Sequence, residues 1–413
     1  MLKKIGVPQV RVGMYIERVC GSWMESPFWQ KSLLLTDDAE LKKLQTSRIR
    51  EVWIDLGKGA DVEDEEELPD EAPAAPAPPV SAPVRLADIA PVPMAQELVV
   101  AAKVLRKSRE AVHSMFGEVR MGKAVTVEDA LPLVEEITTS VMRNAGAMLG
   151  LVRLKNADDY TYMHSVAVCA LMIALGRQLE LDDAQIREAG LAGLLHDIGK
   201  MAIPLWILNK PGKLSDEEFH TVKGHPAAGH KMLAANTDIC AMALDVCLHH
   251  HEKMDGSGYP ERLKGDGISL YARMGAVCDV YDAITSNRPY KQGWCPAESL
   301  RRMAEWRDHF DPVVFAAFVK CIGIYPIGTL VRLKSGLVGV VVEQPVGKSL
   351  VRPKVRVFFS ARSQTYVTPQ LIDLATPAAA HDEIATREDA AKWGLQDINR
   401  YWAGTSTWAG AAA

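Results

Sequence analysis

Hydrophobic and polar residues alternate in the first 60 positions with the two-residue period of β-strands. Residues 10–12 (Val-Arg-Val) and 52–54 (Val-Trp-Ile) place apolar side chains at every second position, as in a strand with one buried face. Between them, residues 36–41 (Thr-Asp-Asp-Ala-Glu-Leu) begin with residue types that cap helices. The pattern therefore predicts a small α+β module over residues 1–62.

The clearest predicted domain boundary follows that module. Residues 63–71 carry seven acidic side chains, and residues 69–93 carry eight prolines. Such a stretch repels itself and has little apolar surface to bury, so residues 63–94 are predicted to be an extended linker.

Apolar residues then recur with the period of a helix. Leu98, Ala102, Leu105, Val112 and Met115 follow one another at three, four and seven positions, which predicts a connecting amphipathic helix over 95–125. This helix would pack on the following domain or pair with its copy in a homodimer. Residues 126–322 have a helical pattern throughout, and they are predicted to form an all-α domain.

The pattern changes again near residue 325. Short runs of β-branched and aromatic residues at 329–333, 339–342 and 354–359 predict a small β appendage within 323–413. A last helix is expected from Ile384 to Trp402, followed by a frayed tail. The predicted fold class is therefore mainly α, with a small α+β module before the helical domain and a small β region after it.

Composition and charge narrow the possible functions. The 413 residues are 48% hydrophobic and 24% charged, with a formal net charge of -5, which indicates a globular protein and argues against general nucleic-acid or membrane-surface binding. The seven cysteines form no CxxC pair, which favours reduced thiols and a cytoplasmic protein. The longest apolar stretch, residues 166–176, is too short to span a bilayer.

The helical region contains an unusual series of residue types that bind metals. Imidazole and carboxylate groups suit iron, manganese and other transition metals, and this set has enough ligands for two ions. Within the helix that contains residues 196–200, Asp197 is expected to bridge the ions, and Lys200 to hold a phosphate oxygen or hydroxide. The series consists of His164, His196, Asp197, His225, His249, His250, His251 and Asp279.

Two neighbouring segments extend this candidate site. Glycines and a proline in residues 255–260 (Asp-Gly-Ser-Gly-Tyr-Pro) predict a tight loop that brings Tyr259 to the mouth of the site. Arg288 and Lys291 follow Asp279 within about three helical turns, as expected of cations that contact phosphate at the edge of a site.

Three motifs give the helical domain a family resemblance. HDIGK at 196–200, HHExxDGxGYP at 250–260 and DVYDAITSNRPYK at 279–291 resemble the HD-GYP family, whose members hydrolyse the bacterial second messenger cyclic di-GMP. The N-terminal module resembles the DUF3391 type of domain. We refer to residues 255–260 as the GYP loop.

The resemblance implies specific roles for these residues. Lys200 is implied to assist catalysis, Arg288 and Lys291 to contact phosphate, and the GYP loop to bind GGDEF-domain proteins. Tyr160 replaces a glutamate that recruits a third metal in some relatives, which favours two divalent ions, and Asn287 replaces a common aspartate. The implied metal ligands are His164, His196, Asp197, His225, His250, His251 and Asp279, with His249 outside the motif.

These observations predict a phosphodiesterase that converts cyclic di-GMP to pGpG, with GMP as the product of a second round. Two other functions remain open from the sequence. One is a cyclic di-GMP receptor without turnover, although such receptors usually lack a ligand or the His-Asp doublet. The other is an HD-type hydrolase of ordinary nucleotides, against which the GYP loop argues.

Overall fold

The chain folds as two compact units, residues 1–82 and 83–413. The computed structural model describes residues 2–20, 32–45, 51–60, 85–154, 160–286, 293–344, 349–379 and 381–404. The predicted linker lies largely outside these residues, and the domain boundaries proposed from the sequence stay predictions.

The first unit is an antiparallel sheet with one helix. Strands β1 (Leu2–Gly6), β2 (Tyr15–Cys20), β3 (Leu33–Leu34) and β4 (Glu51–Asp55) lie in the order β1-β4-β2-β3, and helix α1 covers Asp38–Gln45. Val52 and Ile54 alternate with less buried neighbours and are fully buried. The prediction of a strand at residues 10–12 is wrong. These residues lie between β1 and β2, where the chain turns at Gly13 (φ +95°).

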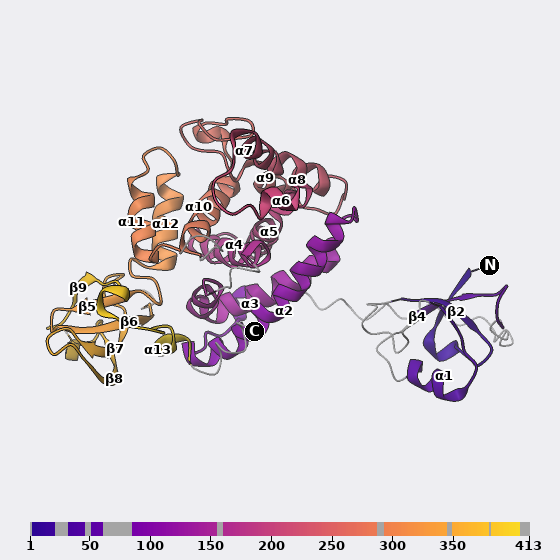
Figure 1. The fold of residues 1–413 in the computed structure, drawn as a ribbon, viewed down its shortest axis with the longest axis horizontal. Coiled ribbons are helices and arrows are strands. Elements are labelled where there is room, and N and C mark those ends of the chain that lie inside the picture. The colour runs from indigo at the N-terminus through magenta and orange to yellow at the C-terminus, as the bar shows by residue number, and fades with distance from the viewer. Residues whose placement is uncertain are drawn as a thin grey trace. The chain divides into compact units, whose positions relative to one another are not determined.

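The second unit is dominated by helices (Figure 1). They are α2 (Met94–Arg120), α3 (Val127–Val152), α4 (Tyr160–Gln178), α5 (Asp183–Leu195), the 3-10 helix η4 (Ile198–Ala202), α6 (Leu205–Leu208), α7 (Asp216–Lys223), α8 (His225–Leu233), α9 (Ala241–His249), α10 (Leu270–Thr285), α11 (Pro296–Glu305) and α12 (Pro312–Ile322). The mainly α fold expected from the sequence is thus confirmed.

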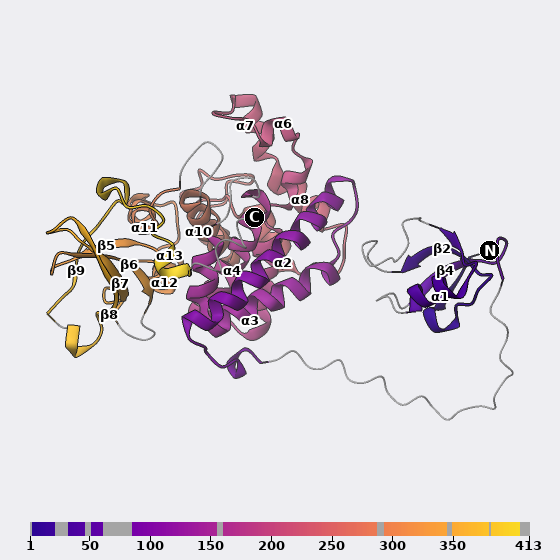
Figure 2. The same ribbon diagram turned by 60° about the horizontal axis from the view of Figure 1, so that its bottom comes forward.

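Helix α4 lies at the centre of this unit, beside α2, α3 and α5 (Figures 1 and 2). Residues 166–175 are buried on every side, which explains why the longest apolar stretch of the chain is a core helix. The apolar face of α2 also belongs to this core, through residues such as Leu98, Leu105 and Val112. This burial favours packing of α2 on its own domain.

The C-terminal strands form a five-stranded antiparallel sheet in the order β8-β7-β6-β5-β9. One side of the sheet has a small core of its own, whereas the other side, through Val338, Val340 and Phe358, joins the core of the helices. The sheet therefore packs directly on the helical domain. Its strands are β5 (Leu330–Leu333), β6 (Leu337–Glu343), β7 (Lys354–Ser360), β8 (Thr365–Asp373) and β9 (Ile384–Arg387).

The prediction of a helix from Ile384 to Trp402 is wrong. Its first four residues form β9, which pairs with β5, and Gly394 adopts a left-handed conformation (φ +62°) that interrupts any helix. Only the short helix α13 (Arg400–Ala403) occurs near its end.

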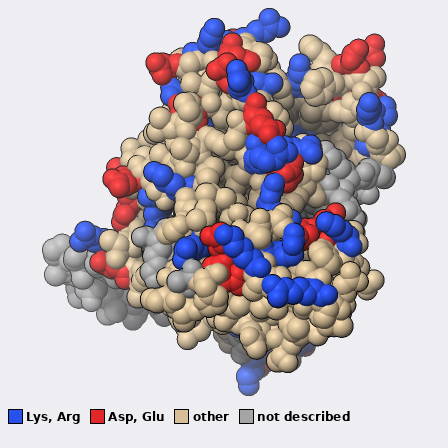
Figure 3. All heavy atoms as spheres, turned by 90° about the vertical axis from the view of Figure 1, so that its left-hand side faces the viewer, with Lys and Arg blue, Asp and Glu red and all other residues tan. Residues whose placement is uncertain are grey.

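Charges of both signs lie next to one another on the face that includes the C-terminal sheet (Figure 3). Arg332 pairs with Glu388 at 2.7 Å, and Arg387 pairs with Glu298 at 3.2 Å. A mixed surface of this kind differs from the single-sign basic patch typical of nucleic-acid binding. Among the described residues, no helix has the length and apolar character that a membrane span requires.

A buried ion pair joins α2 to α3 and generates a test of this packing. Glu97 is fully buried, accepts a 2.6 Å hydrogen bond from Ser140 and lies 2.9 Å from Arg143 Nε. Glu97→Gln removes the charge that Arg143 faces, so we expect the free energy of unfolding to fall by roughly 2 kcal/mol. Urea denaturation measures this change. Glu110→Gln, at an exposed position of the same helix, is the control, and equal stabilities for the two variants would contradict the prediction.

Candidate metal centre

His164 on α4 lies between two carboxylates of α10. Its Nε2 is 2.9 Å from Asp279 Oδ1, and its Nδ1 is 2.6 Å from Asp282 Oδ2. Burial alone would lower the pKa of His164, but the hydrogen bonds to the two carboxylates raise it above its ordinary value. A metal ion that binds Nε2 must therefore displace a proton.

The His-Asp doublet lies where α5 ends rather than inside a helix as expected. Asp182 caps the start of α5, and His196 follows its last residue. His196 Nδ1 is 2.8 Å from the carbonyl oxygen of Gly193, which directs Nε2 toward His164. Gly193 permits this close approach, because a Cβ there would lie 2.8 Å from the Val168 carbonyl oxygen of α4.

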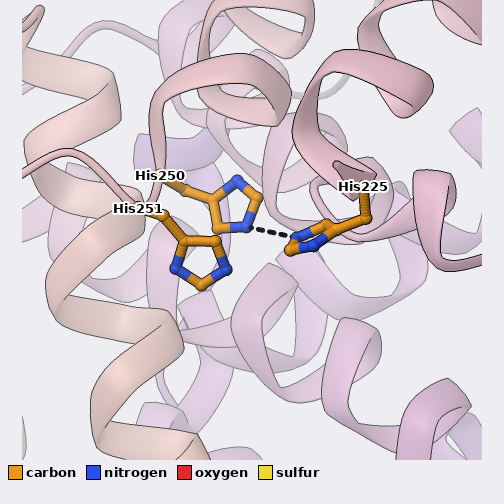
Figure 4. Close-up of side chains that lie close together, drawn as sticks. All are labelled: His225, His250 and His251. Carbon is orange, nitrogen blue, oxygen red and sulfur yellow. Dashed lines mark hydrogen bonds between the residues drawn. The ribbon is translucent and has the colours of Figure 1, made fainter. Parts of the chain in front are cut away.

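Three further histidines, from two other segments of the chain, lie close together (Figure 4). His225 begins α8, and His250 and His251 follow the end of α9. Carbonyl oxygens of the preceding turns lie 2.7 Å from His225 Nδ1 and 3.0 Å from His250 Nδ1. The Nε2 atoms of His225 and His250 consequently face one another at 3.3 Å.

A second glycine contact brings the doublet to His225. A Cβ on Gly199 would lie 1.9 Å from the carbonyl oxygen of His225 and 2.5 Å from the backbone nitrogen of Gly229. Only a residue without a side chain fits between η4 and α8. The glycine of the HDIGK motif thus sets the distance between two parts of the cluster.

The potential ligand atoms form two groups, and Asp197 lies between them. Within each group the atoms are no more than 4.8 Å apart. Asp197 Oδ2 is 3.3 Å from His196 Nε2, whereas Oδ1 is 3.2 Å from His225 Nε2. One carboxylate therefore presents a different oxygen to each group. The first group contains His164, His196 and Asp279, and the second contains His225, His250 and His251. Ligand atoms of His196, Asp197 and His250 also lie within 4.8 Å of one another, so Asp197 links the two groups.

At Asp197, His250 and His251, burial and neighbouring charges favour the protonation states that metal binding needs. Burial alone would raise the pKa of Asp197, but the ammonium group of Lys200 and the neighbouring histidines hold it well below its usual range. Burial lowers the pKa of His251 to about 3, and burial with neighbouring histidines holds that of His250 well below its usual range. The carboxylate is therefore charged and the two imidazoles are neutral at pH 7.

Two atoms at the centre of the cluster fit a cation. Among the described residues, His196 Nε2 and Asp197 Oδ1 are buried side-chain atoms without a hydrogen-bond partner. Buried polar atoms are normally satisfied, so each such atom calls for an explanation. Divalent cations would satisfy these lone pairs, and the nitrogen and oxygen ligands suit a transition metal.

The structure places two of the residues predicted around the cluster beside it, directs one away from it and does not describe two others. Lys200 lies in η4 and forms an ion pair with Asp197, and the ring of Tyr259 lies 4.7 Å from that of His251. Arg288 and Lys291 fall outside the described residues. His249 is directed elsewhere, because Nδ1 pairs with Asp245 at 2.8 Å and Nε2 lies near Glu261 at 3.3 Å.

Three supporting residues were not identified from the sequence. Asp282 orients His164, a role indicated only by its position one turn after Asp279. Glu252 accepts hydrogen bonds from the backbone nitrogens of Glu261 and Arg262 and so holds the GYP loop. Arg120, at the end of α2, donates hydrogen bonds to the carbonyl oxygens of Ile203 (3.1 Å) and Lys200 (3.5 Å) on the η4 segment.

Comparison with known families defines the class of the protein. Residues 144–314 match the HD domain family, and residues 2–130 match the family described as a domain of unknown function (DUF3391). The second match includes α2 and the residues of the predicted linker. An HD domain is thus the part of the chain that contains the His-Asp cluster.

Relatives of known activity place the chain more narrowly. It is 53% identical to the cyclic di-GMP phosphodiesterase PA4108 of Pseudomonas aeruginosa over 98% of this chain and 96% of that protein. It is 40% identical to the cyclic di-GMP phosphodiesterase response regulator RpfG of Xanthomonas campestris over 39% of this chain and 44% of that protein. A solved structure, Bd1817 of Bdellovibrio bacteriovorus, is a more distant match, with 16% identity, a TM-score of 0.44 and coverage of 78% of this chain and 99% of that one.

The chain therefore belongs to the HD-GYP family of cyclic di-GMP phosphodiesterases and carries a DUF3391 domain in its N-terminal part. This confirms the resemblance drawn from the HDIGK and GYP motifs.

The contact between Asp282 and His164 allows a test of whether Asp282 orients the His164 ring for metal binding. Asp282→Asn removes the carboxylate charge that holds His164, so the pKa of His164 should fall and its ring should lose its fixed orientation. Outer partners of this kind typically contribute about 10–100-fold in metal affinity. Competition with a chelator should reveal a loss of that size for the variant.

A matched control for this test exists in the same domain. Asp245→Asn alters the equivalent pair with His249, which is directed away from the cluster. The variant should keep its metal affinity. Equal losses in the two variants would contradict a specific role of Asp282.

Proposed function

We propose that the protein hydrolyses cyclic di-GMP to linear pGpG at a centre of two metal ions. The observation that carries this proposal is the position of Asp197, with one oxygen near His196 and the other near His225. A carboxylate shared in this way is suited to bridging two ions. The protein's relatives act on the same substrate.

Seven side chains would hold the two ions. Asp197 would contribute to both, and each group would supply three further ligands. The absence of a thiolate ligand suits iron or manganese, which are the ions we propose. Cys247 lies near the cluster, but burial raises the pKa of its thiol and keeps it protonated. The proposed ligands are His164, His196, Asp197, His225, His250, His251 and Asp279.

When bound, two divalent ions supply Lewis acidity, which lowers the pKa of water and neutralises charge on a phosphodiester. The net reaction adds one water to one phosphorus and breaks its bond to the 3′ oxygen, which leaves with a proton. The phosphate stays on the 5′ oxygen, so the product is pGpG. Repetition of the same step on pGpG would give GMP.

The protein's own cations would complete the site. The ammonium group of Lys200 lies beside Asp197, where it can hold a phosphate oxygen as negative charge develops. We propose the same role at the edge of the site for Arg288 and Lys291. Burial raises the pKa of Tyr259, so its hydroxyl stays protonated and can donate a hydrogen bond to the nucleotide.

Three broader expectations belong to this proposal. The GYP loop would contact GGDEF-domain proteins, and the chain would act in the cytoplasm. A homodimer through α2 has less support, because the apolar face of α2 is buried in its own domain.

Asp197→Asn provides the central test. Loss of the shared charge should reduce the rate of pGpG formation by at least roughly 10²–10³-fold and should lower the metal content from about two ions per chain. Chromatography of the products and elemental analysis measure the two quantities. Asp238→Asn, at an exposed position, is the control.

Three results would count against the proposal. They are one ion per fully active chain, unchanged turnover by the Asp197→Asn variant, and binding of cyclic di-GMP by the metal-loaded protein without formation of pGpG. The last result would identify a receptor. Hydrolysis of other nucleotides, but not of cyclic di-GMP, would identify a different HD-type hydrolase.

A further inference from the structure

A pocket of about 580 Å³ lies between the end of α7 and the GYP loop. Its volume is within the range of about 300–1,000 Å³ that is usual for small-molecule sites. The wall includes His220 and Lys223 from α7, and Tyr259, Pro260 and Arg262 from the loop and the residues after it. We refer to it as the cationic pocket.

Tyr259 forms the boundary between the cationic pocket and the metal-ligand cluster. Its ring centroid is 4.7 Å from that of His251, and Lys223 Nζ is 5.3 Å from the same ring. Tyr259 therefore lines the pocket and contacts a histidine of the cluster, so the two sites are neighbours.

The basic side chains of the pocket are available to an anion. Among the described residues, neither Lys223 nor Arg262 forms an ion pair with a carboxylate, and Lys223 contacts the rings of Phe219 and Tyr259. In contrast, Lys210, which precedes α7 in the chain, is paired with Glu218 of α7 at 2.7 Å. Two uncompensated cations at one pocket favour a ligand with negative charge.

Hydrogen bonds and a close backbone contact fix the loop that forms one side of the cationic pocket. Glu252 is buried, and its Oε1 accepts hydrogen bonds from the backbone nitrogens of Glu261 (2.7 Å) and Arg262 (3.0 Å). The loop also approaches the backbone closely at Gly258, where a Cβ would lie 2.5 Å from the Cα of Glu252. Arg262 therefore starts from a fixed backbone position.

We infer that the cationic pocket binds the second phosphodiester of a cyclic dinucleotide while the first is cleaved at the metal-ligand cluster. The inference rests on the proposed function. A cyclic dinucleotide carries two phosphodiesters in one ring, so a substrate bound at the cluster must place its other phosphate nearby. Lys223 and Arg262 then select cyclic dinucleotides over simple diesters, which have one phosphate.

Two charge-removing variants test this inference. In Lys223→Gln and Arg262→Gln, each loss of a charged phosphate contact should raise KM for cyclic di-GMP about 10-fold. The kcat should be unchanged, because the contact is the same in the ground state and the transition state. Lys231→Gln, at an exposed position of α8, is the matched control.

A simple diester separates the pocket from the metal centre. Hydrolysis of bis(p-nitrophenyl) phosphate needs the metal centre but has no second phosphate, so both variants should retain it. The same 10-fold loss should appear in the Kd of cyclic di-GMP when each change is made in the Asp197→Asn background. Arg262 is exposed, so its variant keeps the test decisive if Lys223→Gln folds poorly.

The possible outcomes are distinct. An increase in KM for cyclic di-GMP alone supports the inference. An unchanged KM in both variants, or equal losses with both substrates, overturns it. If the unaltered protein hydrolyses bis(p-nitrophenyl) phosphate but not cyclic di-GMP, the proposed substrate is wrong and the inference falls with it.

Discussion

The shared position of the Asp197 carboxylate is the constraint on which the site depends. Its two oxygens lie near nitrogens from α4, the end of α5, α8 and the end of α9. Such a concentration of lone pairs in a buried volume is unfavourable unless a positive charge offsets it. The packing of the helices therefore concentrates unpaired electron pairs at a buried site, and a bound cation would stabilise this arrangement.

Residues without side chains make that arrangement possible. Gly193 lets α5 approach α4, and Gly199 lets η4 approach α8, each at a distance that a Cβ would prevent. The glycine of HDIGK therefore determines whether the doublet and His225 can meet.

The sequence predicted the position of the cluster better than it predicted the C-terminal elements. The residue types indicated eight positions, the family resemblance implied that seven of them are metal ligands, and the structure brings those seven side chains together. Their role as ligands stays a proposal. Asp282 was missed, because its role depends on the direction of its side chain across two helices. The helix expected at Ile384–Trp402 failed for another reason: pairing with β5 overrides local helix preference in a segment of alanines and charged residues.

The shared core of the C-terminal sheet and the helices has a thermodynamic consequence. Val338, Val340 and Phe358 belong to one continuous apolar core with residues of α4 and α10, so the stability of the sheet is coupled to that of the helices that supply His164 and Asp279. A ligand that binds only the native state adds its binding free energy to folding. Chelation would therefore lower the stability of strands β5 to β9 as well as that of the centre itself, although these strands contribute no ligand to it.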